Sequence, residues 1–223
     1  MPITAQREEG LVHVEAGGVE LEGNLIIPRG AKGIVLFAHG SGSSRFSSRN
    51  RYVAEALREG GLGTLLIDLL TRREEAIDER TAHLRFDIGM LADRLVATTE
   101  WLWDREHLPI GLFGASTGGG AALVAAARAP DHIGAVVSRG GRPDLAGPAL
   151  PHVKAPTLLI VGGDDVPVIA MNRAAYDQLK SKRRLEIVPG ASHLFEEPGT
   201  LEIVARLARD WFTEHLGARS AAA

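Results

Sequence analysis

The 223-residue sequence contains no cysteine. This absence excludes disulfide bonds, metal sites built on thiolates and a cysteine nucleophile, and it leaves the redox compartment open. An excess of one charge sign is also lacking, since the formal net charge is only −3, and this small charge points to no polyanionic partner such as nucleic acid. No apolar run approaches the ~20 residues of a membrane span, and the first ten residues lack a basic-then-apolar signal pattern. We therefore expect a cytoplasmic protein with no membrane or nucleic-acid partner.

Three patterns that bind cofactors or metals are missing as well. No G-x-x-x-x-G-K-[ST] stretch occurs, so a P-loop is excluded. Gly40-Ser41-Gly42 hints at a dinucleotide-binding loop, but Arg45 occupies the position of the third glycine. The eight histidines are scattered, with no H-E-x-x-H motif and no paired carboxylate–histidine spacing. We therefore expect no cofactor and no metal.

What the chain does contain is a series of short apolar runs. The stretch 33–38 is typical of a strand buried on both faces of a parallel sheet, and Gly17-Gly18 predicts a hairpin. Together the predicted strands are 11–16, 19–28, 33–38, 63–68, 109–113, 134–138, 156–161 and 184–188. Helices are predicted at about 50–59, 82–105, 119–127 and 169–180 and from Pro198 onward. This alternation predicts an α/β fold with about eight strands in a mostly parallel sheet and helices on both faces.

Two connections show no helical pattern. The charged stretch 71–80 is predicted to be a solvated connection, and 139–154 is rich in glycine and proline, which leaves no room for a large cap. Neither a linker nor an internal repeat is visible. We predict a single domain over 1–217, followed by a featureless tail over 218–223.

The pentapeptide Gly114-Ala115-Ser116-Thr117-Gly118 lies between a predicted strand and a predicted helix. Strand, G-x-S-x-G, helix is the setting of a nucleophile elbow, although the pentapeptide alone is equally consistent with a glycine-rich turn that has no chemistry. The sharp turn forces the serine into a strained conformation, and the flanking glycines remove side chains that would clash. The helix N-terminus beneath the serine favours negative charge.

Other polar residues follow the predicted strands at their carboxyl ends, where open parallel sheets bind ligands. His39-Gly40-Ser41-Gly42 follows 33–38, Asp164-Asp165 follows 156–161, and His193 follows 184–188. The order Ser, Asp, His along the chain is that of an α/β-hydrolase triad. Four matches in order are far more specific than the pentapeptide alone.

With these motifs the sequence resembles the α/β-hydrolase superfamily, and within it the dienelactone-hydrolase-like group. The resemblance covers nearly the whole chain and depends on His39-Gly40, 114–119, 162–168 and 190–193. The stretches 39–50 and 138–147 resemble a bacterial subgroup with a serine nucleophile. Dienelactone hydrolase itself uses a cysteine where this chain has Ser116, so the resemblance favours a serine esterase over a dienelactone hydrolase.

The resemblance assigns roles to these residues. Ser116 is the nucleophile and His193 the base that activates it. The family pattern G-G-x-D-x-P-V places the acidic partner at Asp165, with Asp164 as the alternative. The two N–H donors of the oxyanion hole are those of Thr117, which follows the nucleophile, and of Ser41.

Further residues are candidates for lining the substrate pocket. They are His39, Gly40, Arg45, Arg139 and Arg142, with Arg49 as another arginine of the same kind. Each has a simpler interpretation: the arginines are solvated, and His39 fixes the oxyanion loop by hydrogen bonds.

Taken together, the sequence predicts a hydrolase that cleaves small soluble carboxylic esters through an acyl-enzyme. A thioesterase, a lactone hydrolase and an acyltransferase use the same machinery and stay open as alternatives. A catalytically silent hydrolase fold that serves as a binding module is the alternative outside enzymes. The expected partner is a small-molecule ester, and the resemblance leaves a homodimer open.

Overall fold

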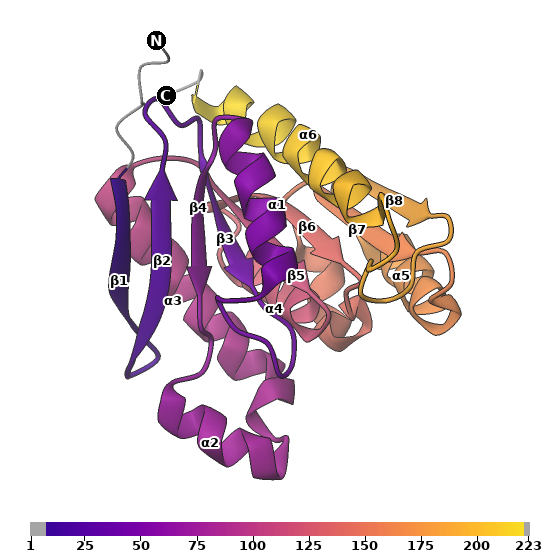
Figure 1. Cartoon of the computed structure of the whole chain (residues 1–223), viewed down its shortest axis with the longest axis horizontal. Helices are drawn as coiled ribbons and strands as arrows, with labels where there is room; N and C mark the ends of the chain where they lie inside the picture. The colour runs from indigo at the N-terminus through magenta and orange to yellow at the C-terminus, as the bar shows by residue number, and fades with distance from the viewer. Residues whose placement is uncertain (1–7, 221–223) are drawn as a thin grey trace.

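The computed structural model describes residues 8–220, with side chains described from residue 10 to residue 217. Its eight strands form one sheet in the order β1-β2-β4-β3-β5-β6-β7-β8 (Figure 1). β2 is antiparallel to both β1 and β4, and all other neighbours are parallel. The strands are β1 (Glu8–Ala16), β2 (Val19–Ile27), β3 (Ile34–Ala38), β4 (Gly63–Ile67), β5 (Ile110–Ala115), β6 (Ile133–Arg139), β7 (Thr157–Gly162) and β8 (Arg183–Val188).

Helices cover both faces of this sheet. In Figure 1, α1 and α6 lie in front of the sheet, whereas α3 and α4 lie behind it. The helices are α1 (Ser48–Glu59), α2 (Arg72–Thr81), α3 (Ile88–Glu106), α4 (Thr117–Arg128), α5 (Val166–Gln178) and α6 (Thr200–Ser220), with short 3₁₀ segments η1 (Leu84–Phe86) and η2 (Pro143–His152). The predicted mostly parallel sheet with helices on both faces is confirmed.

The central strands are apolar throughout because each face of the sheet carries its own hydrophobic cluster. Along β3, Leu36 points into the cluster that includes α3 and α4, while Val35 and Phe37 point into the cluster that includes α1 and α6. The rings of Phe37 and Phe113 lie 4.8 Å apart between their centroids. The carboxyl ends of the parallel strands all lie at the same end of the sheet, which we call its carboxyl edge, and α2 lies below that edge in Figure 1.

The prediction of a solvated connection over 71–80 is wrong, because this stretch forms α2. Thr71 caps the helix: its side chain accepts the Glu74 N–H, and the Glu74 carboxylate accepts the Thr71 N–H at 2.8 Å. Glu74 also binds the buried Arg94 of α3 at 2.6 Å. Capping and this ion pair stabilise a helix that has no clear apolar face.

The long helix predicted over 82–105 begins six residues later than expected. Ala82 adopts a left-handed conformation, with φ 50°, and ends α2. Asp87 then starts α3 by accepting the Met90 N–H at 3.0 Å. At the carboxyl end of the chain, α6 runs through Ser220, past the boundary set at 217, while 221–223 lie outside the described residues.

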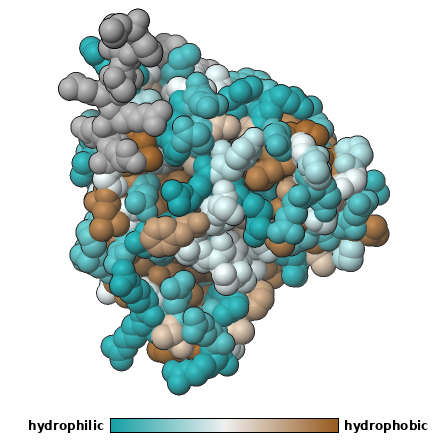
Figure 2. Space-filling model, in the orientation of Figure 1, coloured by the Kyte–Doolittle hydropathy of each residue, from teal (hydrophilic) through white to brown (hydrophobic). Residues whose placement is uncertain are grey.

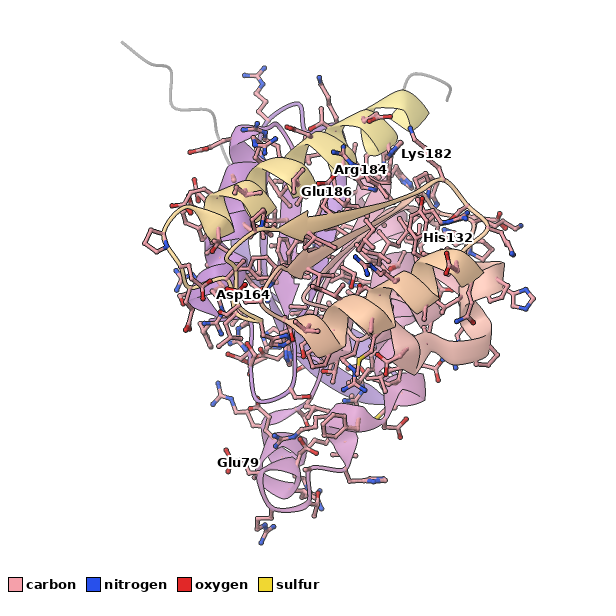
Figure 3. The ribbon with its side chains drawn as sticks, turned by 90° about the vertical axis from the view of Figure 1, so that its right-hand side faces the viewer. Glu79, His132, Asp164, Lys182, Arg184 and Glu186 are labelled. Atoms are coloured by element: carbon pink, nitrogen blue, oxygen red, sulfur yellow. The ribbon has the colours of Figure 1, made fainter. Side chains whose placement is uncertain are left out.

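The outer strand β8 is charged. Figure 3 shows Lys182, Arg184 and Glu186 at this end of the sheet. Arg184 pairs with Glu186, and Lys182 binds Glu214 of α6 at 2.6 Å. Charged side chains on an edge strand disfavour its pairing with another sheet.

Polar side chains cover most of the face that Figure 2 displays, with smaller apolar areas between them. Within residues 8–220, no helix has the length and apolar character needed to cross a membrane.

Candidate active site

Ser116 lies at a strained turn between β5 and α4. Its backbone has φ 50° and ψ −122°, in the left-handed half of conformational space that side chains rarely adopt. The neighbouring glycines permit this turn. A Cβ on Gly114 would lie 2.5 Å from the carbonyl oxygen of Gly118, and one on Gly118 would collide with the carbonyl oxygens of residues 38 and 39. The sequence therefore places Ser116 at the carboxyl edge of the sheet, at the N-terminus of α4.

The turn after β6 holds the backbone of Ser116 in this position. The Ser116 N–H donates to the carbonyl oxygen of Arg139 at 3.3 Å. In return, the Ser116 carbonyl accepts the N–H groups of Gly119 at 2.9 Å and Arg142 at 3.0 Å. With both of its backbone groups bonded, the strained residue is fixed between two elements of the fold.

His193 and Asp165 meet across the loops that follow β8 and β7. His193 Nδ1 lies 2.6 Å from Asp165 Oδ2, with the carboxylate largely buried and the imidazole more exposed. Asp164 has an exposed side chain, and its N–H donates to the carbonyl oxygen of Ala191 at 3.0 Å (Figure 3). Of the two adjacent carboxylates, Asp165 is therefore the one that orients the imidazole.

Ser116 and His193 line one cavity of about 220 Å³, which we call the nucleophile cavity. Its wall consists of Gly40, Ser41, Ser43, Ser47, Arg49, Asn50, Ala115, Ser116, Arg139, His193 and Leu194. Within the described part of the chain, Ser116 Oγ and His193 share no hydrogen bond. In free enzymes such bonds are commonly long and tighten when substrate binds.

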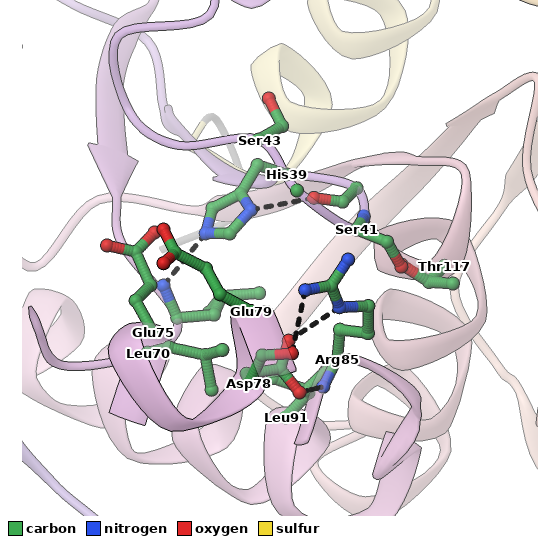
Figure 4. A pocket seen from close by; sticks show the side chains of 13 residues that line it. His39, Ser41, Ser43, Leu70, Glu75, Asp78, Glu79, Arg85, Leu91 and Thr117 are labelled. Carbon is green, nitrogen blue, oxygen red and sulfur yellow. Dashed lines mark hydrogen bonds and ion pairs between the residues drawn. The ribbon is translucent and has the colours of Figure 1, made fainter. Parts of the chain in front are cut away.

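The loop after β3 is fixed by His39. Its Nδ1 donates to the Gly40 carbonyl at 3.0 Å, and its Nε2 accepts the Leu69 N–H at 3.0 Å (Figure 4). Burial lowers the pKa of His39, which favours the neutral ring that this pairing requires. His39 thus holds the loop that carries Ser41.

The two expected oxyanion donors lie side by side, but one of them is engaged. The Ser41 N–H donates to Thr117 Oγ1 at 3.1 Å, and the two hydroxyl oxygens lie 3.0 Å apart. Thr117 is the first residue of α4, where backbone N–H groups have no partner within the helix. A substrate oxygen that binds the Ser41 N–H must therefore displace the Thr117 hydroxyl.

A second cavity, of about 140 Å³, lies between this loop and α2, and we call it the α2 cavity (Figure 4). It shares Gly40, Ser41 and Ser43 with the nucleophile cavity. Its far wall carries the acidic side chains Glu75, Asp78 and Glu79, of which Asp78 binds Arg85 at 2.6 Å. Burial, with Asp68 and Glu79 nearby, raises the pKa of Glu75. The α2 cavity is therefore lined mainly by acidic side chains, whereas arginines line the nucleophile cavity.

The four candidate arginines have different surroundings, and Arg49 lines the nucleophile cavity. Arg139 is buried and lines the nucleophile cavity. Arg142 does not line it: the guanidinium binds Asp144 through two hydrogen bonds of 2.9 and 2.7 Å, and this contact raises its pKa. Arg45 is buried outside the nucleophile cavity, where it binds Asp68 and, at 2.7 Å, Glu22. Arg45 and Arg142, both predicted to line the substrate pocket, therefore lie outside the nucleophile cavity.

Replacing Arg45 with methionine is expected to lower stability by roughly 3 kcal/mol, because it leaves the largely buried carboxylate of Asp68 without its ion-pair partner. The KM for substrate should not change, since Arg45 lies outside the nucleophile cavity. Thermal unfolding and steady-state kinetics measure the two effects. Arg73→Met, which alters an exposed arginine of α2, is the control. A raised KM with unaltered stability would assign Arg45 to substrate binding instead.

Sequence reasoning missed Asn50 and the α2 cavity. Asn50 is buried at the start of α1 and accepts a hydrogen bond from Arg139 at 3.2 Å. Its position just after the loop that follows β3 is the signal that places it at the carboxyl edge. Among the side chains described, those of residues 10–217, there is no group of three or more histidine, aspartate or glutamate residues arranged to hold a metal ion.

Comparison with known proteins supports the fold described above. The model of the dienelactone hydrolase family matches residues 21–215. The crystal structure of a dienelactone hydrolase from Anabaena variabilis ATCC 29413 is 68% identical and has a TM-score of 0.92, covering 95% of this chain and 99% of that one. Est1E from Butyrivibrio proteoclasticus, 18% identical over 92% of this chain and 98% of its own, shares the fold with a TM-score of 0.77.

Two proteins from Mycobacterium tuberculosis, of strains CDC 1551 / Oshkosh and ATCC 25618 / H37Rv, are 58% identical to this chain over 208 residues. Both carry the name "Putative phosphoribosyl transferase". The match covers 92% of this chain but only 46% of those proteins, so the chain spans about half their length.

Proposed function

Since the chain belongs to the dienelactone hydrolase family and has the α/β-hydrolase fold, we propose that it is a serine hydrolase that cleaves small, soluble carboxylic esters. The observation that carries this proposal is the 2.6 Å contact between His193 and Asp165 at the cavity that Ser116 lines. That arrangement leaves Nε2 as the ring nitrogen available to Ser116.

The proposed reaction has two steps. His193 Nε2 takes the Ser116 proton while Oγ bonds to the ester carbon, and the oxyanion is stabilised by the N–H groups of Ser41 and Thr117. The alcohol leaves with the proton from His193, which gives an acyl-enzyme. Water, deprotonated by His193, then attacks the acyl carbon. The bond from the acyl carbon to Ser116 Oγ breaks, Oγ takes the proton back from His193, and the acid leaves.

Phosphoribosyl transfer, the reaction named for the mycobacterial relatives, is not what we propose for this chain. Their match leaves more than half of their length uncovered, so an activity of the whole protein need not reside in the matched part. Ser116, His193 and Asp165 suit acyl transfer to water.

Substrate size tests the proposal. The connection between β6 and β7 forms only η2, and the cavities of about 220 and 140 Å³ are too small to bury a long acyl chain. Each methylene left in water forgoes about 0.8 kcal/mol. We expect kcat/KM for p-nitrophenyl esters to peak at acetate or butyrate and to fall at octanoate and palmitate. Ethyl thioesters and lactones in the same screen separate the alternative hydrolases, and a clear preference for long chains would contradict the small-ester assignment.

The hydrogen bond between the Ser41 N–H and the Thr117 hydroxyl leads to a further prediction. Thr117→Val keeps the shape of the side chain but removes the oxygen that accepts the Ser41 N–H. Because substrate no longer displaces a hydrogen bond worth about 1 kcal/mol, kcat/KM should rise by about fivefold. Thr117→Ser, which keeps the hydroxyl, is the control. If only the valine variant loses activity by more than about tenfold, the hydroxyl itself binds the oxyanion.

A further inference from the structure

The nucleophile cavity contains a buried arginine that has no acidic partner. Arg139 is the last residue of β6, adjacent in the sheet to Ala115, and only 6% of the residue is exposed. Its guanidinium makes one hydrogen bond within the described chain, from Nη2 to Asn50 Oδ1 at 3.2 Å. Nε is buried without a partner, and no carboxylate in residues 10–217 lies within ion-pair distance.

The other arginines that are buried within residues 10–217 are paired. Arg45 binds Asp68 and Glu22, and Arg94 binds Glu74 through two hydrogen bonds of 2.9 and 2.6 Å. A buried charge without a counterion is strongly unfavourable, so a fold that retains one at a ligand cavity has a reason other than stability. Arg139 is the arginine that departs from the pattern, and it does so beside Ser116.

The surroundings of Arg139 leave a surplus of positive charge. Arg49 lines the same cavity and binds the exposed Glu196 at 3.0 Å, while its Nε is buried without a partner. Burial, together with the charge of Arg49, lowers the pKa of Arg139 to about 10, so the guanidinium is still charged at neutral pH. Glu196 neutralises the charge of Arg49, and Asp165 is already bound to His193. The positive charge of Arg139 is therefore left without a counterion among the described side chains.

The α2 cavity on the other side of the oxyanion loop carries the opposite charge. Glu75 and Glu79 face it, and Arg85 there is already bound to Asp78 (Figure 4). A negatively charged group is repelled from that side and attracted to Arg139. The field across the site therefore orients a charged substrate in one direction.

We propose that the substrate carries a compact oxyanion, a carboxylate or a phosphate, which binds Arg139 and Arg49 while the ester carbon lies at Ser116. This inference rests on the proposed ester hydrolysis and names its substrate class. Arg139 determines specificity in this scheme, since a planar guanidinium with free N–H groups suits oxyanions. The cavity of about 220 Å³ limits the anionic part of the ester to a few heavy atoms.

Charge preference tests the proposal. Monoethyl succinate carries its charge on the acyl part and acetoxyacetate on the alcohol part, and ethyl pentanoate is the neutral reference. The wild-type protein should hydrolyse at least one charged ester with a kcat/KM about tenfold or more above the neutral one. Arg139→Met should lower this ratio at least tenfold, and Arg139→Lys should retain part of it. Arg142→Met, whose side chain is bound to Asp144, should leave the ratio unchanged.

Anion binding is also measured without catalysis. Succinate or inorganic phosphate should raise the thermal midpoint of the wild type, and the better of the two identifies the oxyanion. Arg49→Met, at a partly exposed position, should weaken this shift even if Arg139→Met fails to fold. Ser116-dependent hydrolysis that shows neither a charge preference nor an anion-induced shift would overturn the inference alone. Absence of hydrolysis of every ester, with the shift intact, would overturn the proposed function instead.

Discussion

Ser116→Ala is expected to lower kcat for ester hydrolysis by about 10⁴-fold or more, because the nucleophile, the base and the acid act as one unit. Alanine keeps the Cβ that Ser116 already accommodates at φ 50°, so the elbow and its hydrogen bonds to Arg139, Arg142 and Gly119 should persist. The loss should therefore fall on kcat while thermal unfolding stays close to wild type. Burst kinetics with p-nitrophenyl acetate measure the missing acyl-enzyme directly.

A serine-directed fluorophosphonate provides the control for this variant. The wild-type protein should be labelled at Ser116, and Ser116→Ala should not be labelled. Hydrolysis that persists in a pure, unlabelled sample would remove Ser116 from the mechanism. Labelling of neither protein would favour a hydrolase fold that only binds its ligand.

Asp165→Asn is expected to lower kcat by about 10³-fold to 10⁴-fold. The amide cannot stabilise the imidazolium, and its NH₂ group favours the wrong tautomer of His193 at the 2.6 Å contact. KM should change much less than kcat, because Asp165 does not line the nucleophile cavity. Steady-state kinetics on p-nitrophenyl butyrate separate the two constants.

Asp164→Asn is the matched control, one residue away. Its side chain is exposed, and its contact with the β8 loop is made by the backbone N–H, which the substitution keeps. We expect less than about threefold change in kcat, as for other surface substitutions. Equal or reversed effects of the two variants would show that the imidazole has a different acidic partner during the reaction.

The parts of the fold that the sequence predicted best are those that the hydrophobic effect dictates locally. The stretch predicted at 33–38 is β3, and the one predicted at 156–161 is β7, because strands buried on both faces are apolar at every position. The helix α2 was not predicted, because its sequence consists mainly of charged residues and because it is stabilised by Arg94 from another helix. Its capping box, Thr71 with Glu74, was nevertheless visible in the sequence.

The site was predictable to the extent that chain order fixes position. Loops that follow parallel strands meet at one edge, so the placement of Ser116, Asp165 and His193 follows from topology. Chain order could not show which arginines are paired with a carboxylate and which are not. Arg45 and Arg139 are both buried near strand ends, and only the side chains packed around them, contributed by distant elements, distinguish an ion pair from an unpaired cation. The engaged Ser41 N–H likewise depends on the Thr117 rotamer, which spacing cannot predict.

The left-handed backbone of Ser116 has a consequence for anyone who modifies this protein. A residue held in that conformation is stabilised only by what surrounds it, and glycine at the same position would relieve the conformational strain. Selection for heat resistance alone would therefore favour loss of the serine, whereas selection for turnover would keep it. Thermostable variants are best sought on exposed helix faces, away from 114–119 and from the loops that carry Ser41, Asp165 and His193.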